Sequence, residues 1–116
     1  MLDLIIKNAQ CFINNKLVNA DLGIKEGKIL EIGSITKESK DIFDASGLVV
    51  LPGCIDTQVH FREPGSTDAE DLNSGSRAAI AGGITGVFEM PNTNPPTADK
   101  KEFQNKLNLA KNRMYC

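Results

Sequence analysis

The chain has 116 residues and a formal net charge of -2, which leaves room for about one ordinary domain and excludes a large enzyme. Its Lys and Arg residues are dispersed, so neither nucleic acid nor an anionic membrane is an expected partner. No apolar run approaches the roughly 18 residues of a membrane span, and residues 1–6 lead directly into Lys7 and Asn8 rather than into a cleavable signal. A cytoplasmic protein is expected. Its three cysteines lack the spacing of a disulfide framework or a zinc knuckle.

Residues 1–50 predict a β-rich domain. Hairpin turns are expected at Asn14-Asn15 and Glu26-Gly27, because Asn and Gly tolerate positive φ. Residues 34–40 are polar and predict an exposed loop. Short strand-like segments separated by turn residues cover residues 2–6, 11–13, 16–18, 21–25, 28–32 and 42–44.

A second domain, residues 51–116, is expected because the apolar period changes from two to 3.6 near residue 50. Residues 52–65 predict a short buried strand between two turns, and residues 84–90 predict a second buried strand. The helix between them is expected to start at a capping box formed by Thr67 and Glu70 and to end at Gly82-Gly83. Strand, helix and strand make a βαβ unit, whose strands are expected to be parallel with a right-handed crossover.

Two amphipathic faces are predicted for the helices of this second domain. The first helix carries a mostly small, apolar face of Leu72, Ser76, Ala79 and Ile80. Thr97 is expected to cap the last helix. On that helix Phe103, Leu107, Ala110 and Met114 fall at helical spacing, and the lysines at 100, 101, 106 and 111 are expected to face water.

Polar residues alternate along the strand within residues 52–65, where Asp56, Gln58, His60 and Arg62 follow at period two and share one face. Burying such groups without partners costs on the order of 2–7 kcal/mol each, so the strand must offer them hydrogen bonds, a metal or a ligand. The carboxyl end of a parallel strand is where α/β barrels place their sites. Asn92 follows the second strand at the corresponding end.

Each of these residues has a structural alternative to a role in binding. A lone histidine such as His60 is more often a hydrogen-bonded core residue than a ligand. Arg62 could grip a carboxylate through two parallel hydrogen bonds or form a surface pair with Glu63 or Asp68. Asn92 could reach the same ligand or stabilise its turn beside proline.

Two motifs give the chain a specific resemblance, namely PGCIDTQVHFREPG at residues 52–65 and EMPNTNP at residues 89–95. Together with Asp71-Leu72, residues 75–79 and Gly82-Gly83, they resemble the amino-terminal part of a dihydroorotase, a cyclic amidohydrolase. The resemblance implies a mixed β and α/β fold: part of a small β-sandwich, then the first two βα units of a (β/α)8, TIM-like, metal-dependent hydrolase barrel.

The resemblance also implies a chemistry for the parent protein. Dihydroorotases hydrolyse the ring amide of dihydroorotate reversibly to N-carbamoyl-aspartate in pyrimidine biosynthesis, with zinc as the cofactor. His60 matches the second histidine of the family's metal-binding His-x-His motif, and Gln58 replaces the first. Arg62 and Asn92 match the residues that hold the substrate carboxylate.

The chain departs from this family chiefly in its length. Such a barrel takes about 250 residues, and this chain offers two of its eight βα units. We therefore expect no catalytic residue within the chain, no activity of the 116 residues alone, and self-association or pairing with the remainder of a barrel. The alternatives are a catalytically silent homologue that acts as a scaffold for a partner enzyme of the same pathway, which Gln58 makes possible, and an allantoinase- or hydantoinase-type enzyme. Arg62 argues against the last, because those substrates lack the carboxylate that it would hold.

Overall fold

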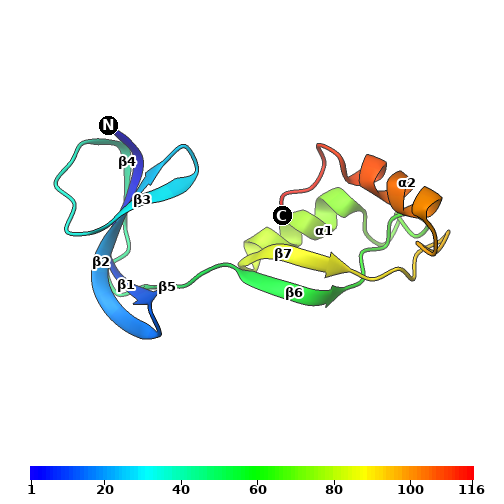
Figure 1. Cartoon of the computed structure of the whole chain (residues 1–116), viewed down its shortest axis with the longest axis horizontal. Coiled ribbons are helices and arrows are strands. Elements are labelled where there is room, and N and C mark those ends of the chain that lie inside the picture. Colours follow the sequence, from blue (N-terminus) through cyan, green and yellow to red (C-terminus); the bar gives the residue numbers. More distant parts are fainter. The chain divides into compact units, whose positions relative to one another are not determined.

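The structure is a computed structural model that describes all 116 residues. Contacts divide the chain into two compact units, Met1–Pro52 and Gly53–Cys116 (Figure 1). None of its helices is both long enough and apolar enough to cross a membrane. The first unit contains strands β1 (Leu2–Ile13), β2 (Lys16–Lys25), β3 (Lys28–Gly33), β4 (Ser39–Asp44) and β5 (Val49–Val50).

One five-stranded sheet makes up the first unit. Its strands are ordered β3-β2-β1-β4, and β5 also pairs with β1. The segments predicted at 2–6 and 11–13 are in fact one continuous strand, as are those at 16–18 and 21–25. A register shift between Ile6 and Ala9, with Asn8 at φ 60°, absorbs the polar interruption in β1. A bulge of this kind bends a strand without ending its pairing.

Both predicted hairpin turns are confirmed. Asn14 and Asn15 join β1 to β2 with φ of 50° and 61°. Glu26 and Gly27 join β2 to β3 with φ of 50° and 72°. Two successive residues at positive φ give the backbone twist that matches the flanking antiparallel strands.

The segment 34–40 is not the wholly exposed loop that its polarity predicts. Ile35 is buried and packs with Leu2 and Ile5 in one of the two apolar clusters of this unit. Its backbone N–H donates to Asp21 Oδ2 at 3.0 Å, and Lys7 Nζ lies 3.1 Å from the same oxygen. A single apolar side chain and a buried carboxylate thus anchor an otherwise polar loop.

In the second unit two parallel strands carry two helices. The elements are β6 (Cys54–Val59), α1 (Leu72–Ala81), β7 (Ile84–Glu89) and α2 (Lys100–Ala110). β6 pairs with β7 in parallel, which confirms the expected βαβ unit. Both helices lie on one side of the strand pair (Figure 1).

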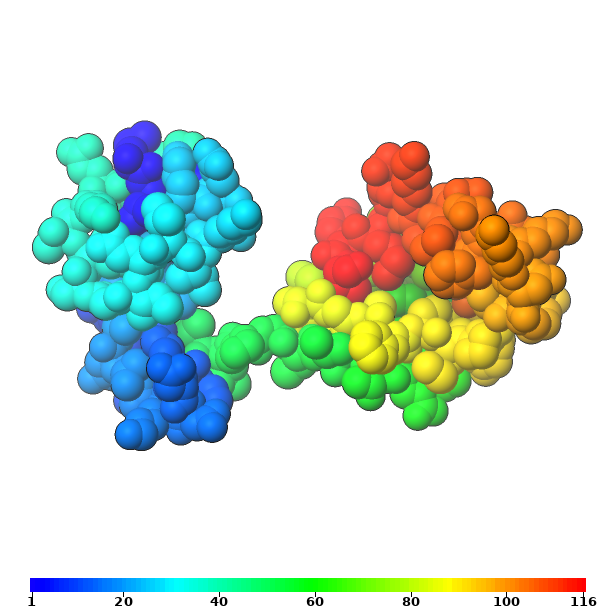
Figure 2. Space-filling model, in the orientation of Figure 1, coloured from blue at the N-terminus to red at the C-terminus, as the bar shows by residue number.

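The strand predicted within residues 52–65 is less buried than expected. Ile55 on β6 and Phe88 on β7 are both 61% exposed, and side chains of the two strands reach the surface of this unit (Figure 2). Phe61, just beyond β6, is buried. The two helices cover one face of the pair, so apolar side chains directed elsewhere stay in contact with solvent.

Both helices begin at aspartate caps, not at the predicted threonines. Asp71 caps α1 by accepting from Ser74 N at 2.6 Å, while Asp71 N donates to Ser74 Oγ in a reciprocal capping box. Asp99 caps α2 by accepting from Glu102 N at 2.8 Å. A carboxylate accepts more strongly than a hydroxyl and also favours the positive end of the helix dipole. Gly83, at φ 84°, takes the positive-φ position predicted after α1.

The face that α1 turns toward Phe61 is set by Gly75. A Cβ at this position would lie 2.6 Å from Phe61 Cδ1 and 2.9 Å from Glu70 Cδ. Leu72 and Ser76 on the predicted face are buried, and Ser76 Oγ donates to Leu72 O at 2.7 Å. Ile80, by contrast, is 41% exposed, so close packing is confined to the amino-terminal half of the helix.

Gly75→Ala is expected to destabilise the second unit, although alanine favours the helix intrinsically by about 1 kcal/mol. The added methyl group would push α1 away from Phe61, and overpacking of this kind costs about 1–3 kcal/mol. The free energy of unfolding in urea, followed by circular dichroism, measures the effect. Arg77→Ala at an exposed position of the same helix is the control, expected to change stability by less than about 0.5 kcal/mol. A Gly75→Ala variant as stable as the wild type would contradict the close packing.

Candidate functional site

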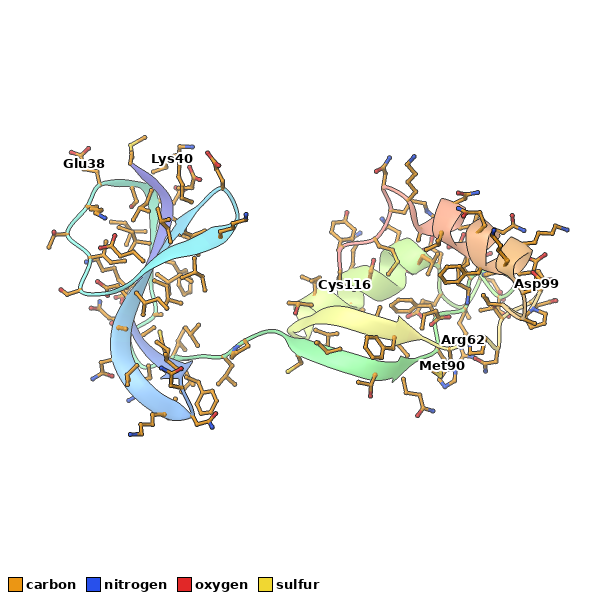
Figure 3. All side chains as sticks on the ribbon, viewed as in Figure 1. Glu38, Lys40, Arg62, Met90, Asp99 and Cys116 are labelled. Carbon is orange, nitrogen blue, oxygen red and sulfur yellow. The ribbon has the colours of Figure 1, made fainter.

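The carboxyl ends of β6 and β7 bring the predicted site residues together. Met90 N donates to Val59 O at 2.9 Å, which is the last backbone hydrogen bond between the two strands. His60 and Arg62 follow β6 directly, and Asn92 follows β7. Figure 3 labels Arg62 and Met90 at these two neighbouring strand ends. Parallel pairing therefore places residues 30 or more positions apart in sequence at one edge.

His60 and Asn92 are in direct contact. The distance from His60 Nδ1 to Asn92 Oδ1 is 2.8 Å. An amide oxygen can only accept, so Nδ1 carries the proton and the Nε2 lone pair is free to bind a metal or a donor. His60 is exposed, unlike the core histidine of the structural alternative. The Asn92 side chain is bonded to His60 through its oxygen, which leaves its two amide N–H groups for another acceptor.

Arg62 is an exposed cation without an internal partner. Its guanidinium forms neither of the predicted surface pairs, with Glu63 or with Asp68. Phe61 and Glu63 on either side of it are buried, whereas Arg62 is exposed. With His60 it lines a hollow that Gly75, Ala78 and Ala79 of α1 also border. The positive charge is available to an anion from outside.

Glu63 faces inward and pairs with Arg113 near the carboxyl end of the chain. Arg113 NH1 and NH2 lie 2.8 and 2.9 Å from Glu63 Oε1 and Oε2, and Leu72 N donates to Oε2 at 2.9 Å. The Arg113 guanidinium and, after it, the Leu72 N–H hold the pKa of the Glu63 carboxyl below its usual range, despite burial. The pKa of Arg113 is raised chiefly by the same contact. This pair fixes the loop that follows Arg62.

The loops after the two strands also contact each other. Asn94 N donates to Pro64 O at 3.0 Å. Gly65, at φ 117°, lies so close that a Cβ would be 2.9 Å from the Asn94 backbone oxygen. The close approach requires glycine, and it draws the loop carrying Asn92 toward the loop that follows Arg62.

The residues of this chain do not by themselves fit a zinc ion. Structural and catalytic zinc sites use three or four nitrogen, sulfur or carboxylate ligands. His60 is the single histidine, and nowhere in the structure do three His, Cys, Asp or Glu side chains gather as a metal site would require. His60 and Gln58 remain predicted ligands of a set that these residues do not complete.

A largely buried ion pair beside the site was missed by the sequence interpretation. Lys106, predicted to face water, is 8% exposed, and its Nζ lies 3.2 Å from Glu89 Oε1. Glu89 Oε2 also accepts from Phe61 N at 3.1 Å. Lys106 falls on the face of α2 that carries Phe103 and Ala110, and Glu89 ends an apolar strand, but nothing in the sequence identifies the two as partners.

The predicted apolar face of α2 is only partly covered. Phe103 and Leu107 are 55% and 46% exposed. They line, with Lys106, Val87 and Leu72, a cavity of about 470 Å³ between α2 and β7.

Comparisons with known proteins place these features in a family. The sequence pattern of the amidohydrolase family matches residues 49–113. The chain is 46% identical over 115 residues to a dihydroorotase of Methanosarcina mazei and 43% identical over 113 residues to an allantoinase of Escherichia coli. Each match covers 97% of this chain and 25% of the relative, so the chain spans about a quarter of the length of these curated relatives.

Solved structures share the fold. An L-hydantoinase from Arthrobacter aurescens aligns with 98% of this chain and 26% of its own at a TM-score of 0.87 and 33% identity. An N-acyl-D-glutamate deacylase from Bordetella bronchiseptica, solved with zinc, aligns with 74% of this chain and 18% of its own at a TM-score of 0.58 and 29% identity. The resemblance to dihydroorotases and the expected fold class are confirmed.

Arg113→Met is expected to destabilise the second unit by about 1–3 kcal/mol at neutral pH, because it leaves the buried Glu63 carboxylate without its charged partner. The folded-state pKa of Glu63 lies below its unfolded value. The stability from this pair is therefore present above the ordinary glutamate pKa of about 4.3 and is lost as the pH falls through the lowered folded-state value.

Urea unfolding of wild type and Arg113→Met at several pH values measures this effect. The difference between them is expected to shrink as the pH falls. Lys101→Met removes an exposed lysine of α2 whose contact with Glu102 is long, 3.9 Å, and is expected to change stability by less than about 0.5 kcal/mol. An equal loss in both variants would contradict a specific role for the Glu63–Arg113 pair.

Proposed function

The chain belongs to the amidohydrolase family, and from that premise we propose that it carries the carboxylate-binding part of a dihydroorotase-type cyclic amidohydrolase. The observation that carries the proposal is the unpaired Arg62 guanidinium beside the His60–Asn92 contact, at the carboxyl ends of two parallel strands. Barrel enzymes build their sites at this edge. The parent reaction is the reversible ring-amide hydrolysis of dihydroorotate to N-carbamoyl-aspartate, a step of pyrimidine biosynthesis.

In this proposal Arg62 and Asn92 hold and orient the substrate. The planar guanidinium of Arg62 can donate two parallel hydrogen bonds to a carboxylate. Asn92, whose amide oxygen is bound to His60, directs its N–H donors to the same anion. Holding the acid group at two points fixes the ring, so the scissile amide meets the attacking oxygen in a reproducible orientation.

Zinc enters the proposal through the resemblance alone. When bound in such a family, zinc polarises a carbonyl and makes water a stronger nucleophile at neutral pH. The residues present do not complete a zinc site, so the roles assigned to this chain are restricted to substrate orientation, with His60 and Gln58 as candidate contributors to a metal site finished by residues outside it.

Two further functions are supported by single observations. An allantoinase-type activity is supported by the 43% identity to the E. coli allantoinase, but leaves the charge of Arg62 without an anion to bind. A catalytically silent homologue that acts as a scaffold is supported by Gln58, because a glutamine amide is a weak metal ligand beside imidazole.

This prediction concerns a protein in which the chain is part of a complete barrel. There, Arg62→Met is expected to reduce transition-state stabilisation with dihydroorotate by about 2–5 kcal/mol, because a desolvated charge pair loses one partner. Asn92→Ala is expected to lose less. Steady-state kinetics, read as kcat/KM, measure both. Arg77→Met, which removes an exposed arginine from α1, is the control and is expected to leave kcat/KM unchanged.

Substrate choice separates the candidate functions in the same assay. Dihydroorotate turned over in preference to allantoin and hydantoin, with the preference lost in Arg62→Met, would support the proposal. Equal kinetic parameters for wild type and Arg62→Met would place the carboxylate elsewhere. No turnover of any of the three substrates would favour the silent homologue.

The 116-residue chain alone is expected not to hydrolyse dihydroorotate, with or without added zinc, because one histidine cannot build a hydrolytic zinc site. A turnover assay against a mock purification measures this. A rate that depends on added zinc and disappears in His60→Ala would contradict the expectation. The same preparation, passed through size-exclusion chromatography with light scattering, reads out the predicted self-association.

A further inference from the structure

The Glu89–Lys106 ion pair is next to the candidate site and contacts the backbone of both strand ends. Glu89 Oε2 accepts from Phe61 N at 3.1 Å, and Glu89 Oε1 lies 3.2 Å from Lys106 Nζ. Lys106 Nζ also donates to Met90 O at 3.4 Å. The side chains of Lys106 and Glu89 are only 10% and 16% exposed.

We propose that Glu89 and Lys106 are positioning residues, which fix the spacing between the β6 end, with His60 and Arg62, and the β7 end, with Asn92. They do so by holding the backbone of both strand ends from the interior. An effect of these two residues on substrate binding rests on the proposed function. Their effect on the spacing of the two strand ends does not.

Backbone pairing alone does not reach the site residues. The last backbone hydrogen bond between the strands joins Met90 N to Val59 O, one residue before His60. The next link is made by the Glu89 side chain to the backbone N–H of Phe61, the residue between His60 and Arg62. The carboxylate thus extends the pairing of the two strands to the point where the site begins.

The second residue of the ion pair, Lys106, acts on the end of β7. Lys106 reaches from α2 to the Met90 carbonyl, two residues before Asn92. Because Lys106 also neutralises Glu89, the carboxylate can stay buried and keep its second oxygen on Phe61 N. A change in Glu89 would therefore alter both strand ends.

The ionic form of this contact indicates a role beyond attaching α2. A buried ion pair contributes little to stability compared with apolar side chains of similar size, because both charges lose their hydration. Two apolar side chains could pack α2 on the sheet, but they could not accept the Phe61 N–H. Of the two functions, only the positioning of backbone groups requires polar atoms.

The His60–Asn92 contact provides a direct readout of this spacing. At 2.8 Å it holds the proton on Nδ1, and a movement of either strand end would release that preference. His60 is the single histidine of the chain, so the nitrogen signals of histidine labelled with ¹⁵N report this contact alone. The signals of the neutral ring identify its tautomer.

Two double variants with uncharged pairs test the proposal in the full chain. Glu89→Gln/Lys106→Met keeps an acceptor for Phe61 N, whereas Glu89→Leu/Lys106→Met removes it at similar size. In the leucine variant we expect loss of the Nδ1–H preference and amide exchange at Phe61 about tenfold faster, the effect of losing one hydrogen bond. In the glutamine variant both readouts are expected to stay close to wild type, as in the control Lys101→Met.

Equal behaviour of the two double variants, whether wild-type or altered, would overturn the proposal, because the acceptor would then not set the spacing. The wild type supplies a test that needs no variant: exchange of the Phe61 amide as fast as that of an exposed loop amide would also overturn it. Calorimetric binding of dihydroorotate to a complete barrel separates the two hypotheses. Absence of binding by the wild type, with the tautomer result intact, would contradict the proposed function and leave the positioning role in place.

Discussion

The parallel pairing of β6 with β7 is the constraint on which the candidate site depends. Register brings His60 and Asn92, which are 32 positions apart, to the same end of the strand pair, where their side chains meet at 2.8 Å. A parallel pair cannot be closed by a tight turn and needs a crossover element, which α1 provides. The close packing of Gly75 in α1 against Phe61 therefore supports the site as well as the core.

Two acidic groups near the strand ends, Glu63 and Glu89, have cationic partners inside the protein, whereas Arg62 pairs with neither. Glu63 is held by Arg113 and Glu89 by Lys106. Both carboxylates lie on the side of the helices, and each also accepts a backbone N–H. Glu63 and Glu89 are thus bound to other cations, and Arg62 forms no ion pair within the protein. Its charge can meet an anion from solution, as recognition of a carboxylate requires.

Family membership and the local geometry limit the function to different degrees. Dihydroorotase, allantoinase and hydantoinase relatives share this part of the fold at 33–46% identity. Fold similarity of this kind does not select one substrate, because function resides in the residues of the site. In the proposed function the distinction rests on Arg62, whose charge suits an acidic ring substrate and gives no advantage with a neutral one.

The sequence by itself determined the β-rich opening, both hairpin turns, the parallel βαβ unit and the positions of His60, Arg62 and Asn92 at its strand ends, because periodicity and turn residues act over a few neighbours. It also carried the family resemblance. The aspartate caps are contacts over three residues, where the sequence interpretation chose threonines. Tertiary structure alone decided the burial of Ile35, the inward position of Lys106 and the pairing of Glu63 with Arg113. These depend on partners distant in sequence: Glu89 lies 17 positions from Lys106 and Glu63 lies 50 from Arg113. Local pattern assigns a lysine to solvent, and only a buried carboxylate brought close by folding can reverse that assignment.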